Sequence, residues 1–279
     1  MDNLEFNLEN IENLLNDLAG ELSEKRDIDQ AKITPDSIFK RINFMKEQND
    51  LYGARLLCIG DFDLTGTLSS IFGNTKEVVV ADIDERIAEI LFEINFDYDK
   101  EIRFVYHDMR KKMIEILKNE FEIVITEPPP TIEGLELFLK RAIISVTPLR
   151  MDHNAIIYIS IPHKKEFRKT LEQLVKDSNG EITHRLEKIN KYIDGREETD
   201  FYRIIYNQNK IPLGNEHYLG PLYSMEVSMK SQPWQCKCGE TIMVGENEKY
   251  KTLKELETKG CPKCRYKGPF RFQTKIEIK

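Results

Sequence analysis

The stretch Leu56-Leu-Cys-Ile-Gly60-Asp61-Phe62-Asp63-Leu64-Thr65-Gly66 is an apolar strand followed by a turn and the start of a helix. Gly60 would let a ligand approach the backbone closely at the carboxyl end of this strand, where open α/β sheets bind ligands. The turn lacks the Gly-x-Gly-x-x-Gly pattern of a pyrophosphate site, and the carboxylates of Asp61 and Asp63 would repel phosphates. They would attract a cation, which favours a cofactor carrying ammonium or sulfonium charge over NAD or ATP.

Short apolar runs alternate with helical stretches along the following chain, and this alternation predicts the fold class. Strands that are apolar throughout indicate a parallel sheet covered on both faces by helices. The expected strands are 56–59, 78–81, 102–105, 123–126 and 156–161, and the expected helices are 65–72, 85–96, 109–119, 131–147 and 164–177. Later strands at 183–192, 200–206 and 222–229 would end the sheet in an antiparallel pair. We therefore expect an α/β protein with a Rossmann-like, class I methyltransferase-type sheet.

Two further helices are predicted ahead of the first strand. Thr34 is a candidate N-cap with Pro35 at the first helical position, so one helix should run from there to about residue 48. The other covers 4–22, where apolar side chains recur at steps of three and four residues among acidic ones: Leu4, Leu8, Ile11, Leu15, Leu18 and Leu22. These helices would serve either as a packed lid on the sheet or as the contact of a homodimer.

Acidic residues also follow the next three expected strands. Asp82 stands 22 residues beyond Gly60, in position to accept hydrogen bonds from both ribose hydroxyls. Asp108 follows the third strand, where an acid can meet an adenine amino group, and His107 beside it could contact the same ligand. Glu127 follows the fourth strand and precedes three prolines. Together these acids indicate a site for an adenosyl cofactor of the S-adenosylmethionine type.

Several segments resemble the archaeal branched-chain polyamine synthases, the bis(aminopropyl)spermidine synthases. They are Gly60-Asp-Phe-Asp-Leu-Thr, Asp82-Ile-Asp-Glu-Arg, His107-Asp-Met-Arg and the stretch 126–141 that begins Thr-Glu-Pro-Pro-Pro. The segment 34–41 also resembles the one just before that family's catalytic domain, so the likeness covers about residues 34–230. The resemblance implies a class I transferase that moves an aminopropyl group from decarboxylated S-adenosylmethionine to an amine of a spermidine-like acceptor.

The site residues expected on this basis fall into two groups. Glu127, held rigidly by the prolines after it, is the expected general base, and Asp61 and Asp63 would supply negative charge to the donor and the acceptor. The expected cofactor-binding residues are Gly60, Asp61, Asp82, Ile83, His107, Asp108, Glu127 and Pro128.

The chain also departs from the family pattern. Phe62 stands at the middle acid of the family's Gly-Asp-Asp-Asp, and Glu127 replaces the acid of its Asp-Pro-Pro. Three functions therefore stay open. Aminopropyl transfer fits the retained acids best. Methyl transfer from intact S-adenosylmethionine to a protein, RNA or small-molecule amine is favoured by Phe62, which removes a charge suited to polyamines. A non-catalytic scaffold is the third, and the retained acids argue against it.

Four of the five cysteines lie close together near the C-terminus. Cys236 and Cys238 form one pair, Cys261 and Cys264 form another, and 22 residues separate the two pairs. Four thiolates at this spacing can hold one Zn²⁺ tetrahedrally with no open position, which predicts a structural rather than a catalytic metal. The surrounding segment offers either a solvated basic face or a docking surface for a macromolecule: Lys249, Lys251, Lys254, Lys263, Arg265, Lys267 and Arg271.

Composition sets the remaining expectations. The 279 residues carry a net charge of −7, which disfavours general nucleic-acid binding. No window reaches the roughly 18 apolar residues that cross a bilayer, and the acidic N-terminus is unlike a secretory signal. We expect a cytoplasmic protein with no membrane partner, whose ligands are a small-molecule donor and an amine acceptor. Its three parts would be a helical segment at 1–50, a transferase domain at 51–230 and a zinc ribbon at 231–279.

Overall fold

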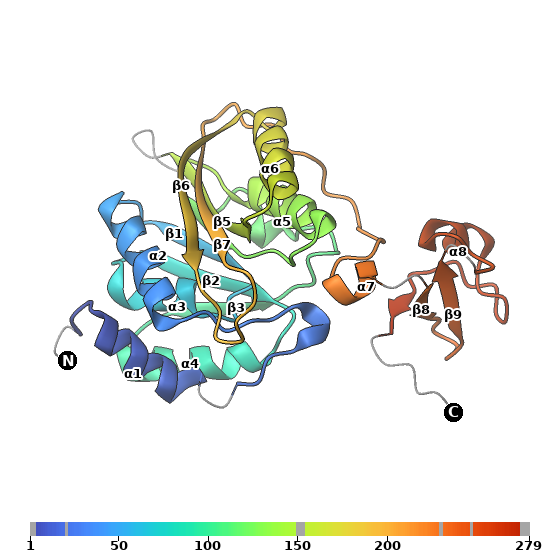
Figure 1. The fold of residues 1–279 in the computed structure, drawn as a ribbon, viewed down its shortest axis with the longest axis horizontal. Coiled ribbons are helices and arrows are strands. Elements are labelled where there is room, and N and C mark those ends of the chain that lie inside the picture. The colour runs from blue at the N-terminus through green and yellow to red at the C-terminus, as the bar shows by residue number, and fades with distance from the viewer. Residues whose placement is uncertain (1–3, 20–21, 149–153, 229–230, 246–247, 274–279) are drawn as a thin grey trace.

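The computed structural model describes residues 4–19, 22–148, 154–228, 231–245 and 248–273, and its main body is a seven-stranded sheet with helices on both faces (Figure 1). The strands of this sheet are β1 (Arg55–Ile59), β2 (Glu77–Asp82), β3 (Ile102–Tyr106), β4 (Ile123–Thr126), β5 (Ala155–Pro162), β6 (Gly180–Asn190) and β7 (Thr199–Tyr206). Their order is β3-β2-β1-β4-β5-β7-β6. Strands β1 to β5 pair in parallel, and β7 runs antiparallel to both β5 and β6. The expected class I methyltransferase-type sheet, with its antiparallel end, is confirmed.

Alternate residues of the central strands face the two layers of helices. Leu57 and Ile59 of β1 join a core with α5 (Ile132–Ser145) and α6 (Lys165–Asp177). Leu56 and Cys58 join the opposite core, with α2 (Pro35–Glu47), α3 (Thr65–Phe72) and α4 (Arg86–Tyr98). This period of two, with both faces buried, is why the inner residues of β1 and β2 are apolar.

The two N-terminal helices cover one side of the sheet as a packed layer. Thr34 caps α2 as expected, accepting a hydrogen bond from the backbone N–H of Ser37 at 3.4 Å. The helix α1 (Leu8–Ala19) begins four residues later than the expected 4–22, and Leu4 is exposed ahead of it. Residues 20–21 of that expected helix lie outside the described residues. Ile11 of α1 is fully buried in the same core as α2, α3 and α4. These contacts are those of a lid on the sheet.

The helix expected at 109–119 is wrong. Only the short 3₁₀ turn η2 (Glu115–Leu117) forms there. Met109, Met113 and Leu117 are buried at a helical spacing of four, which explains the expectation. The backbone N–H of Met113 instead donates to the side chain of Asn215 at 2.8 Å, and Asp108 accepts the N–H of Arg110 at 2.9 Å. Side chains thus satisfy the donors that a helix would have used.

The strand expected at 222–229 is also wrong. Residues Ser224–Ser228 form the short helix α7, and Met229 lies outside the described residues. The carboxylate of Glu226 accepts the backbone N–H of Leu222 at 2.6 Å and closes the turn that starts this helix. The 3₁₀ turn η1 (Arg26–Ile28) lies nearby, because Asp29 accepts the N–H of Ser224 at 2.7 Å.

The C-terminal segment forms a small module with its own sheet, shown in red tones in Figure 1. Its elements are β8 (Ser231–Gln235), β9 (Thr241–Gly245), α8 (Leu253–Lys259) and β10 (Arg271–Phe272), with strand order β10-β8-β9. Trp234 and Leu256 belong to a core cluster separate from those of the main sheet. The expected ribbon segment thus begins directly with β8 at Ser231. Within the described parts of the chain, no helix combines the length and apolarity needed to span a bilayer.

Candidate active site

A cavity of about 360 Å³ lies at the carboxyl ends of β1, β2 and β4. This volume falls within the range of small-molecule sites. Residues of the loops after these strands line it, together with residues 28–31, Tyr192, Arg196, Glu197, Thr199 and Tyr223. The segment between α1 and α2 therefore reaches the same cavity as the loop between β6 and β7.

Nearly all the site residues expected from the sequence meet in this cavity. Those that line it are Gly60, Asp61, Asp63, Asp82, Ile83, His107, Glu127 and Pro128. Asp108 does not line it: this half-buried residue accepts the backbone N–H of Arg110. The catalytic and binding roles of the lining residues remain predictions.

The turn after β1 is shaped by Asp61. This buried carboxylate accepts the N–H groups of Gly66 and Thr67, both at 2.8 Å, and the Thr67 hydroxyl at 2.6 Å. It therefore caps the N-terminus of α3. Gly60 has a φ of +73°, and a Cβ on Gly66 would lie 1.9 Å from Cys58 Sγ, so both positions require glycine. Burial, followed by the charge of Asp63, raises the pKa of Asp61 to about 7.

Asp82 and His107 face the cavity from the next two strand ends. The carboxylate of Asp82 accepts the N–H groups of Asp84 at 2.8 Å and Asp61 at 3.3 Å, and burial raises its pKa. His107 is only 4% exposed, and its Nε2 has no hydrogen-bond partner among the described residues. Burial is the main cause that lowers the pKa of His107, so its imidazole is neutral near pH 7. A buried ring nitrogen without a partner is suited to contact a ligand.

Arg41 of α2 is the principal site residue that the sequence reasoning missed. Its side chain is 1% exposed and lines the cavity. Its Nη1 pairs with Asp63 Oδ2 at 2.6 Å, its Nη2 pairs with Glu127 Oε2 at 2.5 Å, and its Nε donates to Asn190 Oδ1 at 2.6 Å. The available signal was an arginine on the apolar face of the predicted helix, three residues after Ile38.

Tyr192 supplies the second donor to Glu127. Its side chain is 7% exposed, and its hydroxyl donates to Glu127 Oε1. Because that hydroxyl has one proton to give, the contact with Thr199 Oγ1 at 2.8 Å is donated by Thr199. Each carboxylate oxygen of Glu127 thus accepts one hydrogen bond from the protein, which leaves it a further lone pair, and Glu127 lines the cavity.

Acidic groups prevail on the cavity wall. Asp29, Asp61, Asp63, Asp82, Glu127 and Glu197 line it, against three described Lys and Arg side chains. All three of those cations are ion-paired: Arg41 as above, Lys164 with Glu197 at 3.1 Å and Arg196 with Asp194 at 2.7 Å. The cavity therefore suits a cationic ligand better than an anionic one.

The N-terminal segment is tied to the sheet beside this cavity. Asp84, fully buried after β2, accepts hydrogen bonds from Lys25 Nζ and Gln30 Nε2, both at 2.8 Å, and pairs with Arg86 at 2.6 Å. Despite the cost of burial, these donors lower the pKa of Asp84 below its ordinary value. Gln30 also lines the cavity, so this cluster positions one of its walls.

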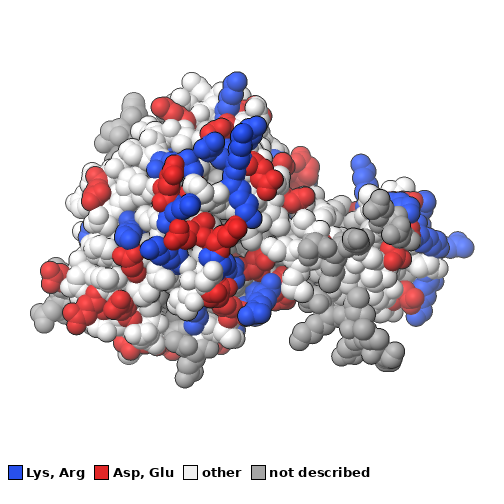
Figure 2. All heavy atoms as spheres, in the orientation of Figure 1, with Lys and Arg blue, Asp and Glu red and all other residues white. Residues whose placement is uncertain are grey.

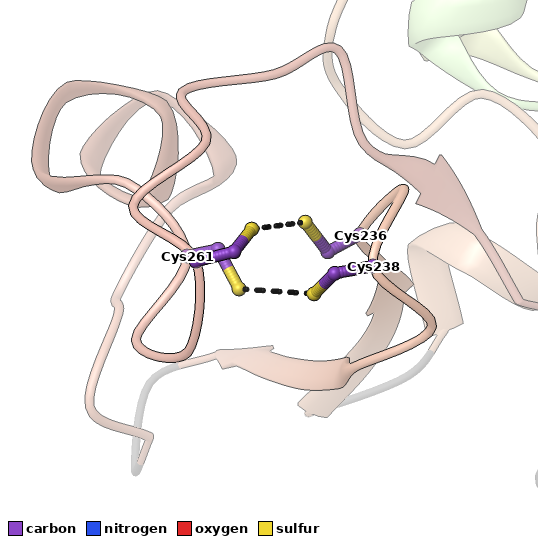
Figure 3. A group of neighbouring side chains, drawn as sticks. Cys236, Cys238 and Cys261 are labelled. Atoms are coloured by element: carbon purple, nitrogen blue, oxygen red, sulfur yellow. Dashed lines mark hydrogen bonds between the residues drawn. The ribbon is translucent and has the colours of Figure 1, made fainter.

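The four clustered cysteines converge in the C-terminal module. Figure 3 shows Cys236 and Cys238 in the loop after β8, with the sulfur atom of Cys238 facing that of Cys261. Their ligand atoms and that of Cys264 lie within 4.8 Å of one another, with Cys236–Cys264 at 3.4 Å and Cys238–Cys261 at 3.8 Å. A tetrahedral Zn²⁺ with bonds of 2.3 Å separates its sulfurs by about 3.8 Å. The geometry fits such a metal.

The exposed surface of this module is basic. Figure 2 shows Lys and Arg side chains gathered at its outer end. The exposed cations of the described part are Lys237, Lys249, Lys251, Lys254, Lys259, Lys263, Arg265, Lys267 and Arg271. Some are paired with acids of the module, as Lys263 is with Glu240 at 3.1 Å.

Sequence comparisons agree on one family. The model of the family described as "Branched-chain polyamine synthase A C-terminal domain" matches residues 20–247. An uncharacterized protein of Methanocaldococcus jannaschii is 30% identical over 228 residues, which cover 80% of this chain and 56% of that protein. The N(4)-bis(aminopropyl)spermidine synthase of the same organism is 30% identical over 181 residues, covering 62% of this chain and 50% of the enzyme. The chain thus spans about half the length of these curated relatives.

The fold comparison points the same way. A crystal structure of the branched-chain polyamine synthase from Thermus thermophilus, in complex with N4-aminopropylspermidine and 5'-methylthioadenosine, matches with a TM-score of 0.69. The match covers 78% of this chain and 69% of that one at 21% sequence identity, which shows a shared fold. Because the family model covers most of the chain, from the segment after α1 to the first strands of the ribbon, the chain belongs to the branched-chain polyamine synthase A C-terminal domain family.

Proposed function

We propose that this protein transfers an aminopropyl group from decarboxylated S-adenosylmethionine to an amine of a polyamine. Membership of the branched-chain polyamine synthase A C-terminal domain family supports this proposal, as do relatives named as bis(aminopropyl)spermidine synthases. The acid-lined cavity at the carboxyl ends of β1, β2 and β4 suits both the sulfonium donor and the cationic acceptor.

The observation that carries the choice of donor is the pairing of the cavity's cations. Arg41, Lys164 and Arg196 each have an acidic partner. The carboxylate of intact S-adenosylmethionine would have to compete with those partners, in a cavity where acids outnumber Lys and Arg. Decarboxylation removes this charge and leaves an ammonium, which acids attract. The cavity therefore favours the decarboxylated donor.

The donor would lie along the first three strand ends. Asp82 would accept hydrogen bonds from the ribose hydroxyls, and Gly60 would allow the donor close to the backbone. The neutral His107, with its unpartnered Nε2, would contact the adenosyl part from the end of β3. Ile83 and Pro128 would supply apolar contact. Asp61 would act chiefly by fixing the turn, because its oxygens already cap α3.

Glu127 would receive the proton that the acceptor ammonium must lose. The freed amine lone pair then attacks the carbon next to sulfur while the carbon–sulfur bond breaks. The bonding pair stays on sulfur, so the sulfonium leaves as a neutral thioether and the positive charge moves to the new amine. Positioning and charge complementarity would supply most of the acceleration, with Asp63 as the second carboxylate at the acceptor.

Methyl transfer from intact S-adenosylmethionine is the second candidate, and one observation favours it. Phe62 lines the cavity at the position where the family pattern has an acid. An aromatic ring there removes one negative charge from the acceptor side and would tolerate a less cationic amine.

The C-terminal module would bind one structural zinc through its four cysteines. The convergence of their sulfur atoms supports this, and four cysteine ligands leave no open position for substrate. Its basic face could dock a macromolecular partner. We propose the boundaries 1–50, 51–230 and 231–279 for the helical segment, the transferase domain and the ribbon.

Product analysis tests the proposed reaction. The purified chain would be incubated with spermidine and either donor, and the products examined by mass spectrometry. We expect spermidine to gain an aminopropyl group from the decarboxylated donor and to remain unchanged with the intact donor. Methylated spermidine, formed only from the intact donor, would favour the second candidate.

A further inference from the structure

Arg41 is an unexpected residue in a cavity built for cations. Its guanidinium lies between two carboxylates of the proposed acceptor side, Asp63 and Glu127, and the pairs are only 2.6 and 2.5 Å long. It also lies 5.4 Å from the centre of the Phe201 ring and donates to Asn190. These contacts fix the guanidinium in one place. A polycation bound in this cavity must therefore lie close to the Arg41 guanidinium as well as to the carboxylates of Asp63 and Glu127.

The formal charges of this cluster have a chemical consequence. Arg41 carries one positive charge, and Asp63 and Glu127 carry one negative charge each, so the three groups together are singly negative. Without Arg41, an acceptor ammonium could bridge both carboxylates itself. Such pairing would stabilise the protonated amine, which has no free lone pair and cannot attack the donor.

We infer that Arg41 is a positioning residue that occupies the bridging place between Asp63 and Glu127 and thereby keeps the acceptor amine from being held as an ammonium. It holds Glu127 with one oxygen turned to α2 and the other to Tyr192. The free lone pairs then accept the proton of the incoming amine. This inference rests on the proposed function, because it concerns the acceptor of the same reaction.

Two measurements on Arg41→Met test the inference, and they should change in opposite directions. Spermidine affinity, measured calorimetrically without donor, should rise roughly tenfold or more, because the local charge becomes doubly negative. Turnover with the decarboxylated donor should fall, because the bound amine stays protonated. A merely structural role for Arg41 would weaken both. Unchanged or weaker spermidine binding by the folded variant would overturn the inference.

Two further variants separate charge from position. Arg41→Lys keeps the positive charge but cannot span both carboxylates, so spermidine affinity should stay near that of the wild type while turnover falls. Arg41→Met combined with Asp63→Asn restores the net charge of −1 at residues 41, 63 and 127. Spermidine affinity should therefore return to the wild-type level while turnover stays low. The double variant also removes the repulsion between unpaired carboxylates, and it provides the test if Arg41→Met alone does not fold.

Arg55 provides the matched control. It too pairs with two carboxylates, Glu77 at 2.7 Å and Glu120 at 2.8 Å, but it does not line the cavity. Arg55→Met should change neither spermidine affinity nor turnover. Failure of the proposed function is distinguishable, since it would appear as no aminopropyl product from the wild type. Even then, Arg41→Met must bind spermidine more tightly than the wild type, or the inference is wrong.

Discussion

Replacing Glu127 by glutamine should separate catalysis from donor binding. The change removes the proposed proton acceptor but keeps an oxygen that can accept from Tyr192. General bases contribute on the order of 10²- to 10⁴-fold to rate, so we expect turnover to fall by that factor. Donor affinity should change little, because the expected ribose and adenosyl contacts come from Asp82 and His107.

The contacts of Glu127 also indicate how much stability Glu127→Gln should lose. Glutamine loses the 2.5 Å ion pair with Arg41, whose side chain is almost fully buried, while the pair with Asp63 at 2.6 Å remains. We expect the free energy of unfolding to fall by about 1–3 kcal/mol, the usual penalty for a buried charged group that loses one partner. Thermal unfolding would measure this loss, and the protein should remain folded at assay temperature.

Chromatography of the polyamine products would give turnover, and calorimetry would give the dissociation constant of the decarboxylated donor. Glu127→Asp is the matched control, because it keeps the carboxylate while withdrawing it by about one bond length. Its turnover should lie between those of the wild type and Glu127→Gln. Equal losses of turnover and donor affinity in Glu127→Gln would refute its assignment as the base.

Three other predictions concern the turn after β1 and the metal centre. Affinity for the decarboxylated donor should rise as the pH increases through about 7, because Asp61 becomes negative there. Asp61→Asn should abolish this rise in affinity. If the pH dependence of donor affinity is the same in Asp61→Asn as in the wild type, Asp61 is not the group responsible. Gly66→Ala should destabilise the fold by about 1–3 kcal/mol, since its Cβ would lie 1.9 Å from Cys58 Sγ. Adding Cys58→Ala should recover part of that loss in denaturant unfolding. The purified protein should contain one zinc per chain by elemental analysis; Cys261→Ser should lower that content, while Cys58→Ser should not.

Much of the fold followed from local pattern because the central strands are buried on both faces. Their largely apolar runs identified β1, β2, β4 and β5, while β3, at the edge of the sheet, is less buried and contains Arg103. The helix α3 was expected at the same residues that it occupies. The two wrong elements have one cause. The side chain of Asn215 accepts the backbone N–H of Met113, and the side chain of Glu226 accepts that of Leu222. The periodicity of apolar residues in the sequence cannot predict such side-chain contacts.

The site residues likewise fall into those that the sequence could predict and those that it could not. Residues at strand ends could be placed together because parallel strands bring their carboxyl ends to one edge. Arg41 and Tyr192 could not, because each reaches Glu127 from a different part of the chain: one lies in α2, the other after β6. An arginine on an apolar helix face signals that a buried partner exists, but the sequence does not say which acid it meets. The pairing with Asp63 and Glu127 required the tertiary structure.

The most direct test of aminopropyl transfer is a comparison of the two donors by calorimetric titration. The wild-type chain would be titrated with decarboxylated and with intact S-adenosylmethionine under the same conditions. Because each Lys and Arg lining the described cavity already has an acidic partner, we expect clearly tighter binding of the decarboxylated donor. Tighter binding of intact S-adenosylmethionine would contradict it and assign this cavity to methyl transfer.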